Sequence, residues 1–261
     1  MTSGLTTNLN KSPYWDDFTP NSQYYKVLFK PSTAVQAREL TTIQSTLQNQ
    51  VSTISDNIFT PGTIISGCNI TVKSNVDYVK IQDNYANGWT MTITDILGLT
   101  AVSNSGLTAI ITNVVPGYVS QSPNLNTLYV SYLNSATNTA IKVFQNDEVL
   151  GIYNAANALV SQITVANSIS SGSSNTTGQG YSVSVDSGII YEKGYYLNVP
   201  SQTIIVTPYS NQPNGISVGF SVNESIITSY QDLSLLDNSQ GSPNYAAPGA
   251  DRLQLSAPGA A

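Results

Sequence analysis

The side chains best suited to chemistry in this sequence are two adjacent carboxylate pairs, Asp16-Asp17 and Asp147-Glu148. A glycoside hydrolase places two carboxylates on either side of one glycosidic bond. Neighbouring residues of a strand point to opposite faces, so neither pair is well placed to act on a single bond. Hydrolysis would require carboxylates brought together from distant parts of the chain, an alternative that the sequence leaves open.

The sequence contains no histidine and a single cysteine, Cys68. Histidine-based triads, histidine metal ligands, zinc fingers and a disulfide within the chain are thereby excluded. Without a histidine to activate it, Cys68 is expected to be a small packed side chain. Residues 83–88 and 237–241 mix Asp, Asn and Gly as calcium loops do, but they lack EF-hand spacing and are typical of turns. We therefore predict no enzyme activity, no metal and no cofactor.

Charge is sparse along the whole chain. Charged residues make up 9% of the 261 residues, against about 25% in ordinary soluble domains, and Ser, Thr and Asn supply about a third of the sequence. The net charge of -6 argues against nucleic acid as a partner. Polar residues interrupt every apolar run before about 18 residues, so no membrane span is predicted. A neutral surface rich in amides and hydroxyls is expected where much of it is buried against other subunits.

One segment, from Ala34 to about Ile58, is predicted to be a helix. Its apolar residues recur at spacings of three and four; they are Leu40, Ile43, Leu47, Val51, Ile54 and Ile58. Thr33 and Gln36 are predicted to form its capping box. The opposite face carries amides and hydroxyls, which leaves two interpretations open: a helix packed on a sheet of its own subunit, or a helix between subunits. The spacing departs from a strict heptad at Val51 and Ile58, which does not favour a long coiled coil.

The rest of the chain has the alternating pattern of strands. Strands are predicted at residues 89–96, 128–133, 181–186 and 216–223, a short strand pair at 63–65 and 69–73, and a hairpin over 189–199 with Gly194 in the left-handed conformation. Residues 1–12 are expected to be a flexible arm and residues 171–180 a loop. Pro248-Gly249 is predicted to turn the chain into a last strand, Arg252 to Ser256.

The predicted fold class is mainly β with one long N-terminal helix (α+β), with antiparallel sandwich-like or barrel-like β subdomains. Composition shifts suggest three parts. Residues 1–83 would hold the arm, a strand, the helix and the strand pair, and would serve assembly or attachment. Residues 84–170 would form an inserted β subdomain of low charge, and residues 171–261 would complete the first part.

Four segments together resemble a family of bacteriophage virion proteins. They are Pro13–Pro31, Ala34–Gln50 with its VQAREL…LQNQ wording, Val218–Thr228, and Leu235–Leu253 with the NYAAPGADRL motif. The family is a domain of tail-fibre and baseplate proteins of tailed phages. In the first segment the resemblance implies a strand that ends at Phe29-Lys30-Pro31.

The resemblance implies a structural component of a phage tail, located in the virion, that attaches fibres or organises the baseplate. It also implies a homo-oligomer, most often a trimer, with other tail or baseplate proteins as partners. The alternative is a receptor-binding adhesin that recognises host-surface glycan through some of its sixteen Tyr and two Trp. A virion-bound glycosidase is a second alternative.

The predicted assembly interface combines the helix with the motifs on either side of the chain. Arg38 and Glu39 are expected to form ion pairs with Asp16, Asp17 or a neighbouring subunit, and Asp251 or Arg252 to anchor the C-terminal turn. The full set is Trp15, Asp16, Asp17, Phe18, Arg38, Glu39, Leu40, Ile43, Leu47, Val51, Ile54, Asp251 and Arg252.

Overall fold

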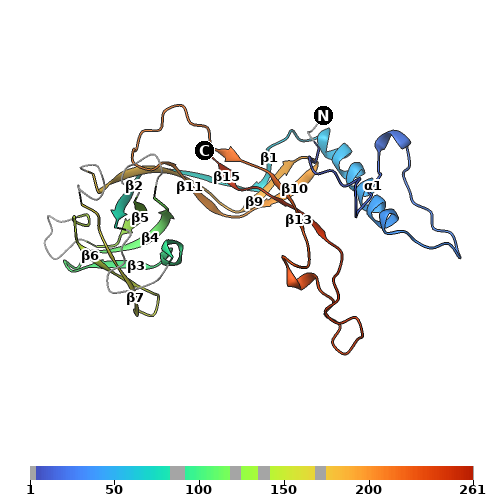
Figure 1. Cartoon of the computed structure of the whole chain (residues 1–261). Coiled ribbons are helices and arrows are strands. Elements are labelled where there is room, and N and C mark those ends of the chain that lie inside the picture. The colour runs from blue at the N-terminus through green and yellow to red at the C-terminus, as the bar shows by residue number, and fades with distance from the viewer. Residues whose placement is uncertain (1–3, 83–91, 118–124, 135–141, 168–174, 261) are drawn as a thin grey trace. The chain divides into compact units, whose positions relative to one another are not determined.

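The computed structural model describes residues 4–82, 92–117, 125–134, 142–167 and 175–260 (Figure 1). The chain is mainly β with one long helix and antiparallel sheets, which confirms the predicted fold class. It divides into two compact units. Unit 1 consists of Met1–Ile70, Val185–Gln202 and Gly219–Ala260, and unit 2 of Thr71–Ser184 and Thr203–Val218.

The predicted helix is confirmed as α1 (Ala37–Asp56) in unit 1. Its capping box differs from the predicted one, because Gln36 is the N-cap and Glu39 the N3 residue. The Gln36 backbone N–H donates to Glu39 Oε2 at 2.9 Å, so the Glu39 carboxylate also lies where the positive end of the helix dipole favours it.

A three-stranded sheet of unit 1 consists of β1 (Thr63–Gly67), β9 (Gly188–Glu192) and β10 (Tyr195–Val199). The predicted hairpin is confirmed, with Lys193 at φ 53° and Gly194 at φ 84°. The predicted strand pair is wrong: β1 pairs with β9, and the next strand, β2 (Ile70–Ile81), joins a different sheet. The partner of β1 comes from a distant part of the chain, which local spacing does not reveal.

Two short strand pairs complete unit 1. They are β13 (Asn223–Ile227) with β14 (Arg252–Ser256), and β12 (Gly219–Phe220) with β15 (Gly259–Ala260). The last predicted strand is thus confirmed at β14. The buried core beneath them consists of Cys68, Val185, Ile190, Leu197, Val199 and Ala257. Burial raises the pKa of the Cys68 thiol, as expected for a packed side chain.

Unit 2 is built on an eight-stranded sheet in the order β11-β8-β2-β5-β4-β3-β6-β7. The strands not yet described are β3 (Thr100–Ser103), β4 (Thr108–Val115), β5 (Asn126–Tyr132), β6 (Val149–Tyr153), β7 (Leu159–Thr164), β8 (Thr177–Val185) and β11 (Gln202–Thr207). A bridge between Ile81 and Val165 joins β2 to the end of β7. Six strands, from β2 to β7, therefore close into a barrel.

The barrel encloses a continuous apolar core. Its largest fully buried members include Ile81, Ile96, Leu107, Ile111, Leu128, Phe144, Leu150, Ile152 and Ile163. At the rim, the Asp147 carboxylate accepts hydrogen bonds from Gln82 and Asn167. Its neighbour Glu148 accepts instead from the Gln145 backbone N–H and the Ser105 hydroxyl. The two adjacent carboxylates thus accept hydrogen bonds from different loops of the barrel.

Several local predictions need correction. Residues 93–96 form a 3-10 helix, Ile93–Ile96, because Thr92 and Asp95 make a capping box there; Trp89 and Met91 lie outside the described residues, as do residues 83–88. The strand predicted over 216–223 is reduced to β12 and the first residue of β13. The loop predicted over 171–180 ends at Thr177, where β8 begins, and residues 171–174 lie outside the described ranges.

No helix within the described ranges combines the length and the apolar character that crossing a membrane requires.

Candidate assembly interface

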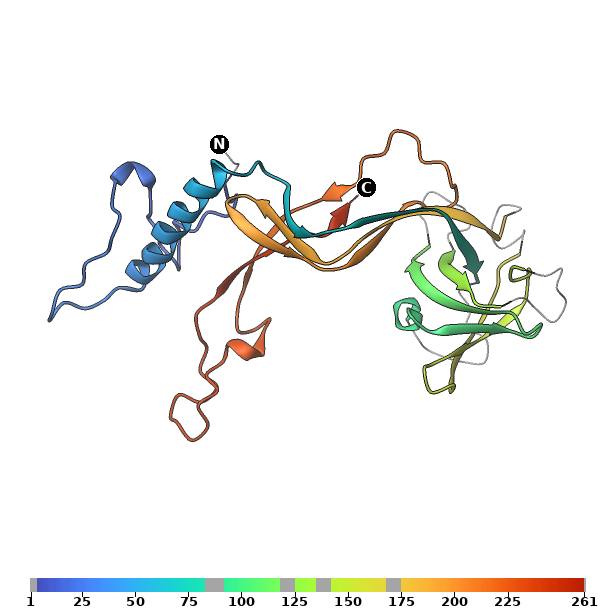
Figure 2. The ribbon, with the colours of Figure 1, turned by 180° about the vertical axis from the view of Figure 1, so that it is seen from behind.

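Helix α1 turns its polar face toward its own chain. Both views place α1 beside the tip of the β9–β10 hairpin (Figure 1 and Figure 2). Gln48 Nε2 donates to the Gly194 carbonyl oxygen at 2.6 Å, and Ser55 Oγ lies 2.8 Å from the Tyr196 hydroxyl. Hydrogen bonds from polar side chains in the middle and the last turn of α1 therefore hold the helix on the hairpin.

An aromatic cluster anchors the C-terminal end of α1. The Phe59 ring centroid lies 5.8 Å from that of Tyr191 and 6.2 Å from that of Tyr196. The Tyr191 hydroxyl donates to Asp56 Oδ1 at 2.5 Å. Burial, together with this bond to a carboxylate, raises the pKa of Tyr191 to about 12, so the phenol stays protonated and remains a donor at neutral pH.

The apolar face of α1 is the one left open. The exposed fractions are 53% for Leu40, 62% for Leu47, 44% for Val51 and 64% for Ile54, and 66% for Ile58 in the turn just beyond the helix. Ile43 is half-buried. Amphipathic helices normally bury the apolar stripe and expose the polar face, and α1 does the reverse within its own chain.

The N-terminal end of α1 is held by the preceding segment. The predicted contact between Arg38 and Asp17 is confirmed, with Arg38 Nη1 at 3.2 Å from Asp17 Oδ2 and side chains 49% and 53% exposed. An exposed pair of this kind contributes only about 0–1 kcal/mol. The Asp16 carboxylate accepts a hydrogen bond from the Ser45 hydroxyl, while Glu39 caps the helix instead of forming an ion pair among the described residues.

Residues 13–35 expose many large apolar side chains. The exposed set is Trp15, Tyr24, Tyr25, Leu28, Phe29 and Val35, with Tyr24 at 77% and Leu28 at 74%; Phe18 is half-buried. The strand that the family resemblance implied before Pro31 is absent from the described structure, in which residues 23–30 have no regular secondary structure. A strand needs a hydrogen-bonding neighbour, and no described strand pairs with this segment.

Glu224 fastens the N-terminal arm. Its carboxylate accepts hydrogen bonds from the backbone N–H groups of Thr6 at 2.9 Å and Thr7 at 2.7 Å. Lys193 Nζ donates to the same carboxylate at 2.6 Å. The sequence predicted a flexible arm over residues 1–12. Its residues 6 and 7 are instead held by Glu224 of β13, which also binds Lys193 at the hairpin tip.

Asp251 joins the C-terminal turn to the N-terminal segment, as its Oδ2 accepts a hydrogen bond from the Tyr14 hydroxyl at 2.6 Å. The neighbouring Arg252 donates through Nη1 to the carbonyl oxygens of Ala250 at 2.6 Å and Asp251 at 3.3 Å. Of the two residues predicted to anchor the turn, Asp251 makes the long-range contact, with Tyr14. Arg252 stabilises the turn locally, through hydrogen bonds to the backbone of the two residues before it.

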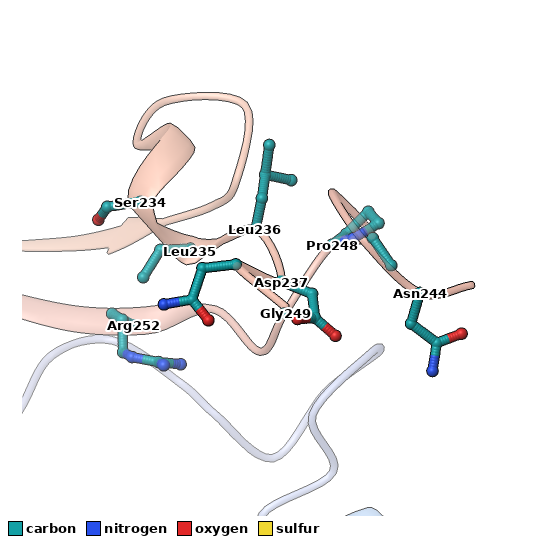
Figure 3. A pocket seen from close by; sticks show the side chains of 10 residues that line it. Ser234, Leu235, Leu236, Asp237, Asn244, Pro248, Gly249 and Arg252 are labelled. Carbon is teal, nitrogen blue, oxygen red and sulfur yellow. The ribbon is translucent and has the colours of Figure 1, made fainter. Parts of the chain in front are cut away.

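The NYAAPGADRL motif closes a loop over residues 235–249. The Gly249 N–H donates to the Leu235 carbonyl oxygen at 3.0 Å, and a Cβ at Gly249 would lie 2.5 Å from that oxygen. Only glycine fits this approach. Figure 3 shows the shallow groove that results; it is lined by residues 234–238, 244, 247–249 and 252.

The Asp-Asn-Gly stretch at 237–241 is a turn, in which Asp237 Oδ1 accepts from the Ser239 N–H at 2.8 Å. Within the described residues, no group of three or more His, Cys, Asp and Glu side chains could hold a metal ion.

Sequence reasoning missed the contacts of Tyr14, Lys193 and Glu224, because each joins residues far apart in the chain and no local pattern marks them. The polar face of α1 did carry a signal. Thr41, Ser45, Gln48, Ser52 and Ser55 alternate at spacings of four and three, the spacing of a packed face.

The family model described as a domain of unknown function, DUF4815, matches residues 12–130 and 147–259 of the chain. No curated protein and no solved structure matches the chain significantly.

Proposed function

The chain belongs to the DUF4815 family, and we propose that it is a structural component of a bacteriophage tail, in a fibre or the baseplate. In this role it attaches fibres or organises the baseplate, and it works as a homo-oligomer, with a trimer as the expected state. Its other partners are neighbouring tail or baseplate proteins.

The observation that carries the proposal is the orientation of α1. Four apolar side chains along its outer face, and Ile58 just beyond its end, are each at least 44% exposed, while Gln48 and Ser55 form hydrogen bonds to the hairpin of the same chain. Contiguous exposed apolar side chains mark surfaces that another molecule covers. A permanent assembly also suits a chain with 9% charged residues, since the cores of lasting interfaces are poor in charge.

The carboxylates that could have suggested hydrolysis are engaged in holding the fold. Asp16 binds Ser45 and Asp17 binds Arg38 next to α1. Asp147 and Glu148 bind separate loops of the barrel. These contacts favour the structural role over the glycosidase alternative.

Cross-linking mass spectrometry on purified phage particles that encode this chain tests the proposal. We expect cross-links to tail proteins from Lys26, Lys30 or Lys73. We also expect particles without tails or without fibres when the gene is silenced. Absence of the chain from intact particles would overturn the proposal. Binding to a glycan array by the purified chain, or turnover of host polysaccharide, would favour the adhesin or the glycosidase instead.

A further inference from the structure

We infer that the exposed stripe of α1 is a self-association seam, in which copies of this helix pack against one another in parallel and in register. The seam consists of Leu40, Gln44, Leu47, Val51 and Ile54 of α1, and it continues to Ile58 in the turn that follows the helix. This inference rests on one part of the proposed function, namely that the chain acts as a homo-oligomer. It identifies the partner that covers α1 as the same helix of another copy.

The spacing of the exposed side chains identifies the partner as a helix of the same repeat. Leu40, Leu47 and Ile54 lie at intervals of seven residues. Val51 and Ile58 are also seven residues apart, and they lie four residues after Leu47 and Ile54. The sequence pattern looked irregular because it included Ile43, which the structure half-buries. The remaining stripe alternates strictly between steps of four and three, which is the repeat of a coiled-coil seam.

Gln44 favours copies that run parallel. It occupies the seam position seven residues before Val51, and its side chain is exposed. An amide both donates and accepts hydrogen bonds, so identical amides at one level satisfy one another. In an antiparallel pair that matches Leu47 with Val51, Gln44 would instead face the apolar Ile54.

The charges of α1 do not oppose this packing. Its ionisable residues are each bound within the chain: Arg38 to Asp17, Glu39 to the N-cap backbone and Asp56 to Tyr191. The residues that flank the stripe, among them Thr41, Gln48, Gln50 and Asn57, are neutral. Identical copies can therefore approach along the whole stripe without bringing like charges together.

Cysteine cross-linking of the full chain tests the seam. Leu40→Cys and Ile54→Cys are made separately, and each purified protein is oxidised with copper phenanthroline. In a parallel, in-register seam each variant alone forms a disulfide-linked dimer in more than half of the chains, because each cysteine meets its own copy. Thr53→Cys, exposed on another face, should give little product, as should the wild-type chain with its buried Cys68.

The alternative outcomes separate the two proposals. A third variant, Ile58→Cys, tests the antiparallel pairing, because the pair that matches Leu47 with Val51 places Leu40 opposite Ile58. If a mixture of Leu40→Cys and Ile58→Cys cross-links while each variant alone does not, the copies are antiparallel and the inference is overturned. If mass photometry shows an oligomer but none of these proteins cross-links, another surface holds the copies together; the seam is then rejected and the proposed function stands. A monomer at micromolar concentration that is also absent from phage particles would reject both.

Discussion

Lys193 and Glu224 form an ion pair at 2.6 Å, with side chains only 14% and 4% exposed. Lys193 lies at the tip of the β9–β10 hairpin in the left-handed conformation, at φ 53°, and Glu224 lies in β13. The same carboxylate holds the backbone of Thr6 and Thr7. One side chain thus joins three segments of unit 1 that are distant in sequence.

Replacing Glu224 by Gln should lower the free energy of unfolding by about 2–3 kcal/mol, because the buried ammonium of Lys193 loses its charged acceptor. Urea denaturation followed by circular dichroism measures the change. Glu192→Gln is the matched control, since Glu192 forms no ion pair among the described residues, and it should change stability by less than about 0.5 kcal/mol. Equal effects of the two variants would contradict the assigned role of Glu224.

The same carboxylate should make stability depend on acid. Burial by itself raises the pKa of Glu224, but Lys193 and the N–H groups of Thr6 and Thr7 outweigh it and hold the pKa well below its usual range. A lowered folded-state pKa gives stabilisation that is complete above the unfolded-state pKa, about 4.3, and is lost as the pH falls further.

Thermal unfolding measured between pH 7 and pH 3 checks this dependence. The gap in Tm between the wild-type chain and Glu224→Gln should be constant above about pH 5 and narrow progressively below about pH 4.3. A gap of constant width down to pH 3 would show that the Glu224 carboxylate carries no such linkage.

Gly194 should tolerate no side chain, for two reasons. It lies at φ 84°, and an added Cβ would sit 2.9 Å from Ser52 Cβ of α1. Gly194→Ala should therefore push α1 off the hairpin and cost more than the roughly 1 kcal/mol expected from backbone strain alone. Gly62→Ala isolates the strain, because Gly62 has φ 82° and nothing within 4 Å of the added Cβ. Similar melting temperatures for the two variants would rule out the steric contact.

The hydroxyl of Tyr14 should protect the C-terminal turn from proteolysis. Tyr14→Phe removes the donor to Asp251 and should raise the rate of limited proteolysis near residues 246–252 several-fold, since a hydrogen bond to a charged group stabilises by about 1.5–3 kcal/mol. Arg252→Ala should act in the same direction by freeing the carbonyls of residues 250 and 251. Tyr230→Phe, at a side chain 92% exposed, serves as the control and should leave the digestion pattern unchanged.

Local sequence patterns were sufficient for elements whose cause is local. The spacing in α1, the Lys193-Gly194 turn and the Pro248-Gly249 turn before β14 each predicted an element that the structure contains. At residues 92–95 the sequence analysis missed a local pattern, because Thr92 and Asp95 have the spacing of a capping box. This capping box starts a 3-10 helix where the alternating threonines had suggested a strand.

Pairing between distant segments could not be predicted from the sequence, because no local pattern determines it. Nothing in residues 63–67 indicates that β9 is their partner, and nothing near Asp251 indicates Tyr14. The amphipathic pattern of α1 identified two faces correctly. It did not indicate which face is turned inward, because that choice depends on hydrogen bonds of Gln48 and Ser55 to a hairpin formed far along the chain.

The amide of Gln44 should set the register of the α1 seam at some cost in affinity. Gln44→Leu replaces the one polar residue of the stripe and should strengthen self-association, so that oligomers persist on tenfold greater dilution in mass photometry. Specificity should fall at the same time, because a buried polar residue at such a position excludes other registers and oligomer sizes. Combining Gln44→Leu with Leu40→Cys should therefore lower the yield of the in-register disulfide. Thr53→Leu, outside the seam, should change neither dilution stability nor cross-linking, and a similar gain from that variant would mean that added apolar surface alone drives association.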